Sequence, residues 1–247
     1  MTSPLIAGNW KMNGVSADLA EAMALAEALE SQPASVRVAL CPPATLIERM
    51  SRAVMGSAVL VGGEDCHAQI TGAFTGDISA EMLADAGAKL VIVGHSERRA
   101  GHGETDSIVA AKALAAVRAG LEPIICVGET LAEREAGRAL AVVAVQIAGS
   151  VPAALGGAAV TVAYEPVWAI GTGLTPTIAQ IEEVHRAIRA SLGQALGEAG
   201  AAVAILYGGS VKPSNASEIL KAAEVGGALV GGASLKAADF LQIVRAI

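Results

Sequence analysis

Short apolar runs alternate with longer segments of helical periodicity along the whole 247-residue chain. The short runs are typical of buried strands, and the longer segments of helices that bury one face. The pattern predicts eight strands, namely Leu5–Ala7, Val36–Cys41, Ala58–Gly62, Leu90–Val93, Pro123–Val127, Val160–Ala163, Val203–Tyr207 and Ala228–Val230. The clearest helical segments are Ala17–Glu30, Asp106–Ala119, Leu131–Ala148, Ile178–Leu196 and Ser214–Ala223. Thr177, with Gln180 three residues later, has the pattern of a capping box ahead of one of these helices.

Strand–helix alternation of this kind indicates an α/β protein with parallel strands joined by right-handed crossovers. Eight such units within about 250 residues is the size of a closed (β/α)8 barrel. A doubly wound open sheet is the alternative, because alternation alone does not show closure. No Ser/Gly/Pro-rich linker divides the chain, so we expect one domain over residues 1–247.

Charge and composition narrow the classes of partner. The chain has 17 basic and 24 acidic residues, a net charge of -7, and no run rich in Lys or Arg. This argues against nucleic acid and anionic membranes as partners. The three cysteines are widely spaced and form no CxxC motif, which is typical of a reducing compartment. The N-terminus has no signal-peptide pattern, and no apolar run is as long as a membrane helix. We therefore expect a cytoplasmic protein.

Polar residues follow five of the predicted strands, where a barrel of this class carries its chemistry. Asn9 and Lys11 follow the first strand, His95 the fourth and Glu165 the sixth. Glu165 comes directly after an apolar run, which is a suitable place for a general base. Taken alone, each residue also has an ordinary explanation, such as a solvated lysine or a structural histidine.

Glycine pairs follow the seventh and eighth predicted strands, at Gly208-Gly209 and Gly231-Gly232. Tight turns alone could explain them. Together, however, consecutive exposed backbone N–H groups after these two strands form the usual phosphate site of such barrels.

Seven motifs resemble those of the triosephosphate isomerase family, in the family's order and spacing across essentially the whole chain. The motifs are Ala7–Asn13, Gly72–Gly76, Val93–Arg99, Cys126–Glu129, Ala163–Gly173, Tyr207–Val211 and Val230–Leu235. The resemblance implies a TIM barrel that interconverts dihydroxyacetone phosphate and D-glyceraldehyde 3-phosphate through an enediolate, in glycolysis and gluconeogenesis. The chain has no nicotinamide fingerprint, P-loop or clustered His/Cys metal site, so no cofactor or metal is expected.

The resemblance also assigns catalytic roles. Glu165 would move the proton between adjacent carbons, and a neutral His95 would polarise the carbonyl and shuttle protons between the two oxygens. Lys11 would balance negative charge, with a further hydrogen bond from Asn9. Glu97 is similar to the family's supporting carboxylate near the lysine.

The remaining implied features concern the phosphate, a lid and a second subunit. Backbone N–H groups around Gly171, Ser210, Gly231 and Gly232 would hold the phosphate. The segment Pro166–Pro176 resembles the family's mobile lid, which closes over the substrate. The Thr71–Asp77 loop resembles the one that docks into a second subunit, so a homodimer is expected, with Thr75 reaching toward the neighbouring pocket.

Two rival functions share some of these features. Another phosphate-binding barrel enzyme would also have the glycines after strands seven and eight. It would not need Lys11, His95 and Glu165 together with an intact lid. A non-catalytic binding protein of the same fold would be favoured by a missing base or histidine, but both residues are present.

Two positions depart from the family pattern. In relatives, the tyrosine matching Tyr207 bonds a backbone N–H at the position of Pro176, and proline has no N–H. We therefore expect a bond from Ser210 to the Gly173 backbone to carry more of the closed state. Glu64 stands where glutamine is more usual, and opens the loop expected to enter the dimer interface. We expect it to be buried there without a cation nearby, with Asp65 adding like charge, and hence to have a raised pKa.

Overall fold

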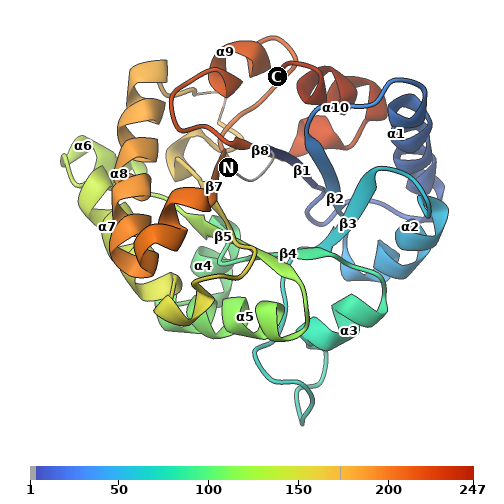
Figure 1. Ribbon diagram of the computed structural model, residues 1–247, viewed down its shortest axis with the longest axis horizontal. Helices are drawn as coiled ribbons and strands as arrows, with labels where there is room; N and C mark the ends of the chain where they lie inside the picture. Colours follow the sequence, from blue (N-terminus) through green and yellow to red (C-terminus); the bar gives the residue numbers. More distant parts are fainter. Residues whose placement is uncertain (1–3, 173) are drawn as a thin grey trace.

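Eight parallel strands form a closed barrel in which each strand pairs with the next along the chain and β8 pairs with β1 (Figure 1). The structure is a computed structural model that describes residues 4–172 and 174–247. The strands are β1 Leu5–Asn9, β2 Arg37–Cys41, β3 Val59–Gly63, β4 Leu90–Val93, β5 Glu122–Val127, β6 Thr161–Tyr164, β7 Ala204–Tyr207 and β8 Gly227–Val230. All eight predicted strands are confirmed, with ends that differ by at most two residues, and closure of the barrel excludes the open sheet.

The strands are apolar on both faces because both faces are buried. On β1, Leu5 and Ala7 contribute to a cluster inside the barrel, while Ile6 between them belongs to the larger cluster that includes the helices. The same alternation places Ile124 and Cys126 of β5 inside and Ile125 outside. Side chains on a strand point alternately to opposite faces, so a doubly covered strand becomes the near-continuous apolar run seen in the sequence.

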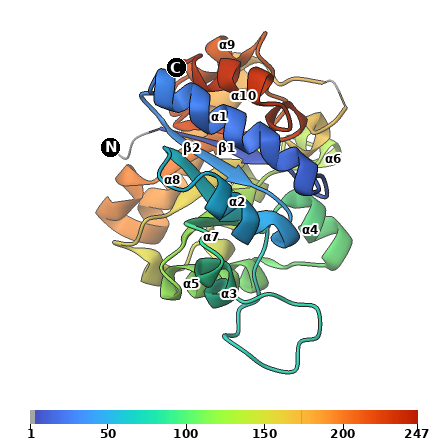
Figure 2. The same ribbon diagram turned by 90° about the vertical axis from the view of Figure 1, so that its right-hand side faces the viewer.

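Helices surround the barrel on all sides (Figures 1 and 2). They are α1 Leu19–Ser31, α2 Ile47–Ala53, α3 Ala80–Asp85, α4 Ser96–His102, α5 Asp106–Arg118, α6 Leu131–Glu135, α7 Ala139–Ser150, α8 Ile178–Leu196, α9 Ala216–Leu220 and α10 Ala237–Val244. Within the described residues, none of these helices has the length and apolarity that crossing a membrane requires.

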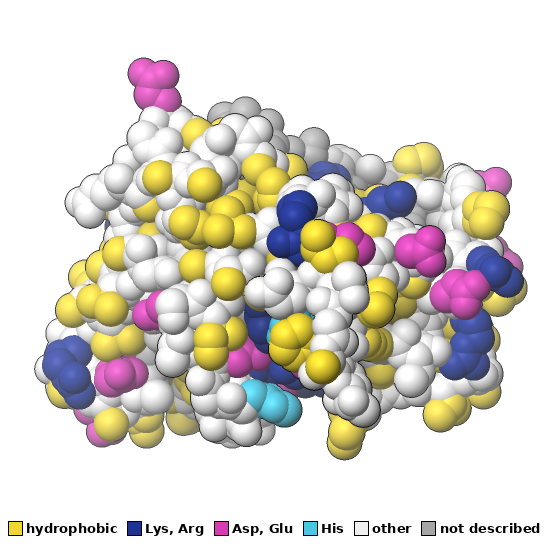
Figure 3. Space-filling view, turned by 90° about the horizontal axis from the view of Figure 1, so that it is seen from below, with side chains coloured by type: hydrophobic (Ala, Val, Ile, Leu, Met, Phe, Trp, Pro, Cys, Tyr) yellow, Lys and Arg dark blue, Asp and Glu magenta, His cyan; other side chains and the backbone are white. Residues whose placement is uncertain are grey.

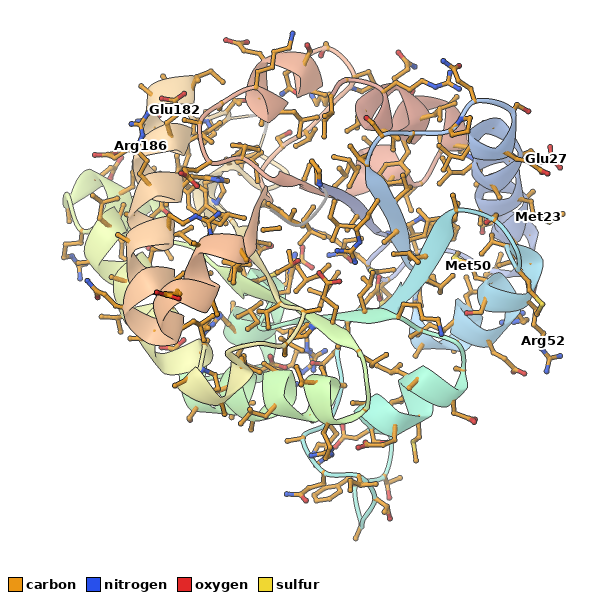
Figure 4. The ribbon with its side chains drawn as sticks, in the orientation of Figure 1. Met23, Glu27, Met50, Arg52, Glu182 and Arg186 are labelled. Atoms are coloured by element: carbon orange, nitrogen blue, oxygen red, sulfur yellow. The ribbon has the colours of Figure 1, made fainter. Side chains whose placement is uncertain are left out.

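Helix α8 shows how the sequence sets a helix start and an outer face. The Thr177 hydroxyl accepts the Gln180 N–H at 3.3 Å, and the Gln180 side chain accepts the Thr177 N–H at 2.9 Å, which confirms the predicted capping box. Glu182 and Arg186, one turn apart, form a 2.6 Å ion pair on the exposed side of α8 (Figure 4). An exposed pair of this kind adds only about 0.3–0.5 kcal/mol, so α8 depends mainly on its buried side.

Helices α1 and α2 follow the same division between an exposed and a buried side. Met23, Glu27 and Arg52 lie on the outer rim of the molecule (Figure 4). Met50, two residues before Arg52, is fully buried. The apolar periodicity of the sequence therefore marks the side of each helix that faces the barrel.

Two predicted helices differ from the structure. The segment 131–148 is broken into α6 and α7 at Gly137, whose φ of 68° lies in the left-handed region. There the Arg138 N–H donates to the Glu133 carbonyl and the Gly137 N–H to the Arg134 carbonyl, a Schellman ending for α6. The segment 214–223 contains only the short helix α9, because Asn215 and a turn precede it.

A long connection follows β3 and projects from the side of the barrel (Figures 1 and 2). It covers residues 64–79 and contains a single bridge, His67 with Ser79. The His67 ring lies 4.1 Å from the Phe74 ring, centroid to centroid, and the Gln69 N–H donates to the His67 imidazole at 3.1 Å. Side chains of the loop therefore contact one another, although the loop projects away from the core.

Candidate active site

The carboxyl ends of several strands open into one cavity of about 390 Å³. Its lining includes every predicted catalytic residue except Glu97, and every predicted phosphate-binding residue: Asn9, Lys11, His95, Glu165, Gly171, Ser210, Gly231 and Gly232. These residues come from the ends of β1, β4, β6, β7 and β8 and from the segment after β6. The structure thus brings together residues that lie more than 200 positions apart in the chain.

Glu165 begins the segment after β6 and is almost fully buried, with 1% of its surface exposed. Its Oε2 accepts the Ser96 N–H at 2.9 Å, and its Oε1 lies 2.7 Å from Nε2 of His95. A Cβ on Gly128 would lie only 1.6 Å from the Glu165 carbonyl oxygen, so the residue directly after β5 must be glycine for the two backbones to meet. These contacts fix both the backbone and the carboxylate of Glu165.

His95 caps the first turn of α4 through its own side chain. Nδ1 of the imidazole accepts the Glu97 N–H at 3.3 Å. A ring nitrogen that accepts a hydrogen bond carries no proton. We therefore assign the proton of a neutral imidazole to Nε2, the nitrogen that lies 2.7 Å from the Glu165 carboxylate. His95 can therefore donate a hydrogen bond from Nε2 as a neutral group.

Lys11 has a backbone conformation that non-glycine residues rarely adopt, with φ at 55°. Its N–H donates to the side-chain oxygen of Asn9 at 3.1 Å, which supports the turn. Its ammonium forms an ion pair with Glu97. Glu97 thus acts on the site through Lys11 and does not itself line the cavity. A strained backbone of this kind is a common feature of functional sites.

The opposite wall of the cavity consists largely of backbone. Within the described part of the chain, no hydrogen bond occupies the N–H groups of Ser210, Gly231 and Gly232. The Ser234 N–H and hydroxyl both bond the Gly231 carbonyl, at 2.8 and 2.7 Å, and so fix the turn after β8. Unoccupied backbone donors near one another can bind an anion without an added cation.

Comparison with known proteins supports the family that the sequence motifs resemble. The family model described as "Triosephosphate isomerase" matches residues 4–247. The chain belongs to the triosephosphate isomerase family. It is 63% identical to the triosephosphate isomerase of Caulobacter vibrioides over 99% of this chain and 96% of that protein. It is 61% identical to that of Afipia carboxidovorans, over 98% and 97% respectively.

A solved structure supports the family at the level of the fold. The crystal structure of triosephosphate isomerase from Bartonella henselae superimposes with a TM-score of 0.91 at 48% sequence identity, covering 98% of each chain. The single closed (β/α)8 barrel is therefore the TIM barrel of this family, as the resemblance implied.

A second cavity of about 600 Å³ lies on the other side of Lys11, and Asn9, Lys11 and His95 line both cavities. Glu64 lines this second cavity, and its Oε1 is buried without a partner among the described residues. Burial raises the pKa of Glu64 to about 8, and the charge of Glu97 adds to the rise. The backbone N–H and the charge of Lys11 both oppose it, so the expectation that no cation lies nearby is wrong. The predicted rise of this pKa is confirmed.

The source of like charge near Glu64 differs from the prediction. Asp65 is paired with Arg98 and with Lys112, at 2.7 Å in each case. Its charge is therefore compensated, and the like charge that acts on Glu64 comes from Glu97. Arg98 and Lys112 lie 33 and more residues beyond Asp65, so no inspection of neighbouring sequence could find these partners.

The segment that resembles the family's lid ends at Pro176, which has no N–H. Pro176 is buried, and the Tyr207 hydroxyl is buried without a partner among the described residues. Gly173, which the sequence suggested as a partner of Ser210, lies outside the described residues. The ranking of Tyr207 and Ser210 in holding the lid therefore stays a prediction.

Two contributors were missed by sequence reasoning. The Ser96 N–H holds Glu165, although Ser96 was visible only as part of the motif around His95. Lys212 also lines the cavity, two residues after Ser210. Its position after β7 was a usable signal, but a single lysine is more often a solvated charge than a ligand.

Proposed function

We propose that this protein interconverts dihydroxyacetone phosphate and D-glyceraldehyde 3-phosphate, as an aldose–ketose isomerase of glycolysis and gluconeogenesis. The observation that carries the proposal is the convergence of Glu165, His95 and Lys11 on one cavity whose opposite wall is unoccupied backbone N–H. A small molecule with a carbonyl at one end and a phosphate at the other fits this division.

The reaction is a proton transfer between adjacent carbons. The Glu165 carboxylate removes a proton from C1 of the ketose, and the electrons of the broken C–H bond form an enediolate. Nε2–H of His95 donates to the carbonyl oxygen and stabilises the charge that develops there. His95 gives its Nε2 proton to the oxygen on C2 and takes up the hydroxyl proton from the oxygen on C1, so that C1 becomes a carbonyl carbon. Glu165 returns its proton to C2, which gives the aldose. The Lys11 ammonium offsets the negative charge, and Asn9 adds a donor.

The observed conformation is a resting one for Glu165. Its carboxylate is bonded to the Ser96 N–H and lies against His95, so it must leave Ser96 before it can reach a substrate carbon. Binding of phosphate to the N–H groups around Gly171, Ser210, Gly231 and Gly232 would draw residues 166–176 over the cavity. Closure excludes water, which protects an enediolate that would otherwise expel phosphate.

A coupled assay tests the function directly. Dihydroxyacetone phosphate formed from glyceraldehyde 3-phosphate is reduced by a dehydrogenase, and the loss of NADH is followed. The parent protein should turn over, and Glu165→Gln, which keeps the shape and removes the base, should lose at least about a hundredfold in kcat. A parent protein without turnover would exclude the proposal in favour of a binding protein.

Self-association is the second part of the proposal: a cytoplasmic homodimer formed through the Thr71–Asp77 loop. The loop carries Phe74, which is 43% exposed, on a face where hydrophobic side chains are widespread (Figure 3). The second cavity, beside Lys11, would receive the tip of this loop from another copy, with Thr75 at that tip.

Sedimentation tests this assembly. The parent should sediment at about twice its 24.6 kDa chain mass, and Phe74→Asp should shift it toward the monomer because a charge cannot enter the cavity unpaired. Leu131→Asp is the matched control, since Leu131 is 45% exposed on α6. A Phe74→Asp protein that stays as dimeric as the control would contradict this role of the loop.

A further inference from the structure

Lys212 lies on the wall of the catalytic cavity beside the backbone donors. It shares that lining with Ser210, Gly231 and Gly232. Its backbone is fixed, because the Lys212 N–H donates to the Asn215 side chain at 2.8 Å, and the Asn215 amide donates back to the Ser210 carbonyl at 3.1 Å. The turn therefore holds Lys212 in a constant position relative to Ser210.

The ammonium of Lys212 is exposed and uncompensated. Within the described residues it has no ion pair and no hydrogen bond. Lys11, the other lysine of the cavity, is already paired with Glu97. The third charged side chain of the lining is Glu165, which is buried. Because Glu97 already offsets the charge of Lys11, the cavity without Lys212 would carry the uncompensated formal charge of Glu165 and would offer no net attraction to an anion.

The negative net charge of the whole chain makes the positive charge of Lys212 important. A net charge of -7 repels a phosphate dianion at long range. The neutral N–H groups that hold the phosphate act only at hydrogen-bond distance. An exposed cation beside them can act over the Debye length, about 8 Å at physiological ionic strength and about 30 Å at 0.01 M.

We propose that Lys212 is a substrate-capture residue that attracts the phosphate dianion into the cavity and delivers it to the N–H groups around Ser210 and Gly231. The inference rests on the proposed function, since it takes the phosphate of the triose substrate as the ligand. Lys212 acts on the encounter and has no part in moving the proton. Its removal therefore lowers kcat/KM and leaves kcat unchanged.

The test compares Lys212→Gln, Lys212→Arg and the parent with D-glyceraldehyde 3-phosphate at ionic strengths of about 0.02 M and 0.3 M. At low ionic strength, Lys212→Gln should lose roughly three- to tenfold in kcat/KM, and at high ionic strength the difference should largely disappear. Lys212→Arg should restore the parent value. Lys221→Gln is the matched control, because Lys221 is also exposed and lacks an ion pair within the described residues but does not line the cavity.

Phosphate-free D-glyceraldehyde separates capture from a structural effect. Its kcat/KM should be the same for Lys212→Gln and the parent. A loss with this neutral substrate, a fall in kcat, or a loss that equals that of Lys221→Gln would overturn the assignment. Failure of the proposed function itself would look different, since the parent would then not isomerise glyceraldehyde 3-phosphate at all.

Discussion

Two carboxylates, the buried Glu165 and the half-buried Glu64, lie in the two cavities that share Lys11 and have opposite environments. Glu165, in the catalytic cavity, has one oxygen bonded to the Ser96 N–H and the other within 2.7 Å of His95. Glu64, in the second cavity, has an oxygen without a partner among the described residues, and burial raises its pKa to about 8. The difference lies in the partners that the fold supplies, which suit one carboxylate to work as a base and leave the other costly to ionise.

The largest effect is expected from shortening the first carboxylate. Glu165→Asp withdraws the base by about 1 Å, and a misplacement of that size can cost roughly a hundredfold in rate. The loss should appear mainly in kcat from steady-state kinetics. A kcat within a few-fold of the parent would show that Glu165 is not the base.

Replacing Glu64, the second carboxylate, is expected to change the stability of the folded protein. The folded pKa of Glu64, about 8, lies above the unfolded value near 4.3. The folded state therefore binds more protons, and stability falls as pH rises from about 4 through 8. Glu64→Gln removes this titration, so it should raise the free energy of unfolding at pH 8 by about 1–3 kcal/mol and leave activity nearly unchanged.

Melting temperatures of the parent and Glu64→Gln at pH 5 and pH 8, at equal protomer concentration, measure this effect. The gain should be larger at pH 8 than at pH 5. Glu30→Gln is the control, since Glu30 is exposed and has no hydrogen bond or ion pair among the described residues. No gain for Glu64→Gln at pH 8 would show that the carboxylate is solvated or paired in solution.

The smallest effect concerns the two side chains near the lid. The Tyr207 hydroxyl has no partner within the described residues and Pro176 offers no N–H, so removing the hydroxyl should change little. We predict that Ser210→Ala slows turnover more than Tyr207→Phe does. Steady-state kinetics of the two variants would refute this if they gave the reverse order.

The barrel and its catalytic rim could be predicted from the sequence for a physical reason. Strands covered on both faces appear as unbroken apolar runs, and the polar residues that follow them collect at one end of a parallel barrel. Asn9, His95 and Glu165 could therefore be placed together although they lie far apart in the chain.

The partners of these side chains could not be predicted in the same way. The pairing of Asp65 with Arg98 and Lys112 depends on how α4 and α5 pack, which no local pattern records. The break of the 131–148 helix rests on a left-handed residue at Gly137, and a glycine inside a helical pattern does not by itself end a helix.

The central claim is that Glu165 carries a proton between the two carbons through an enediolate. Isomerisation in D₂O tests this most directly, because a carboxylic acid exchanges its proton with solvent before returning it. Magnetic resonance of the sugar phosphates after many turnovers should show deuterium at C1 of dihydroxyacetone phosphate and at C2 of glyceraldehyde 3-phosphate. Isomerisation with no solvent deuterium at either carbon would show a direct hydride shift and contradict the account.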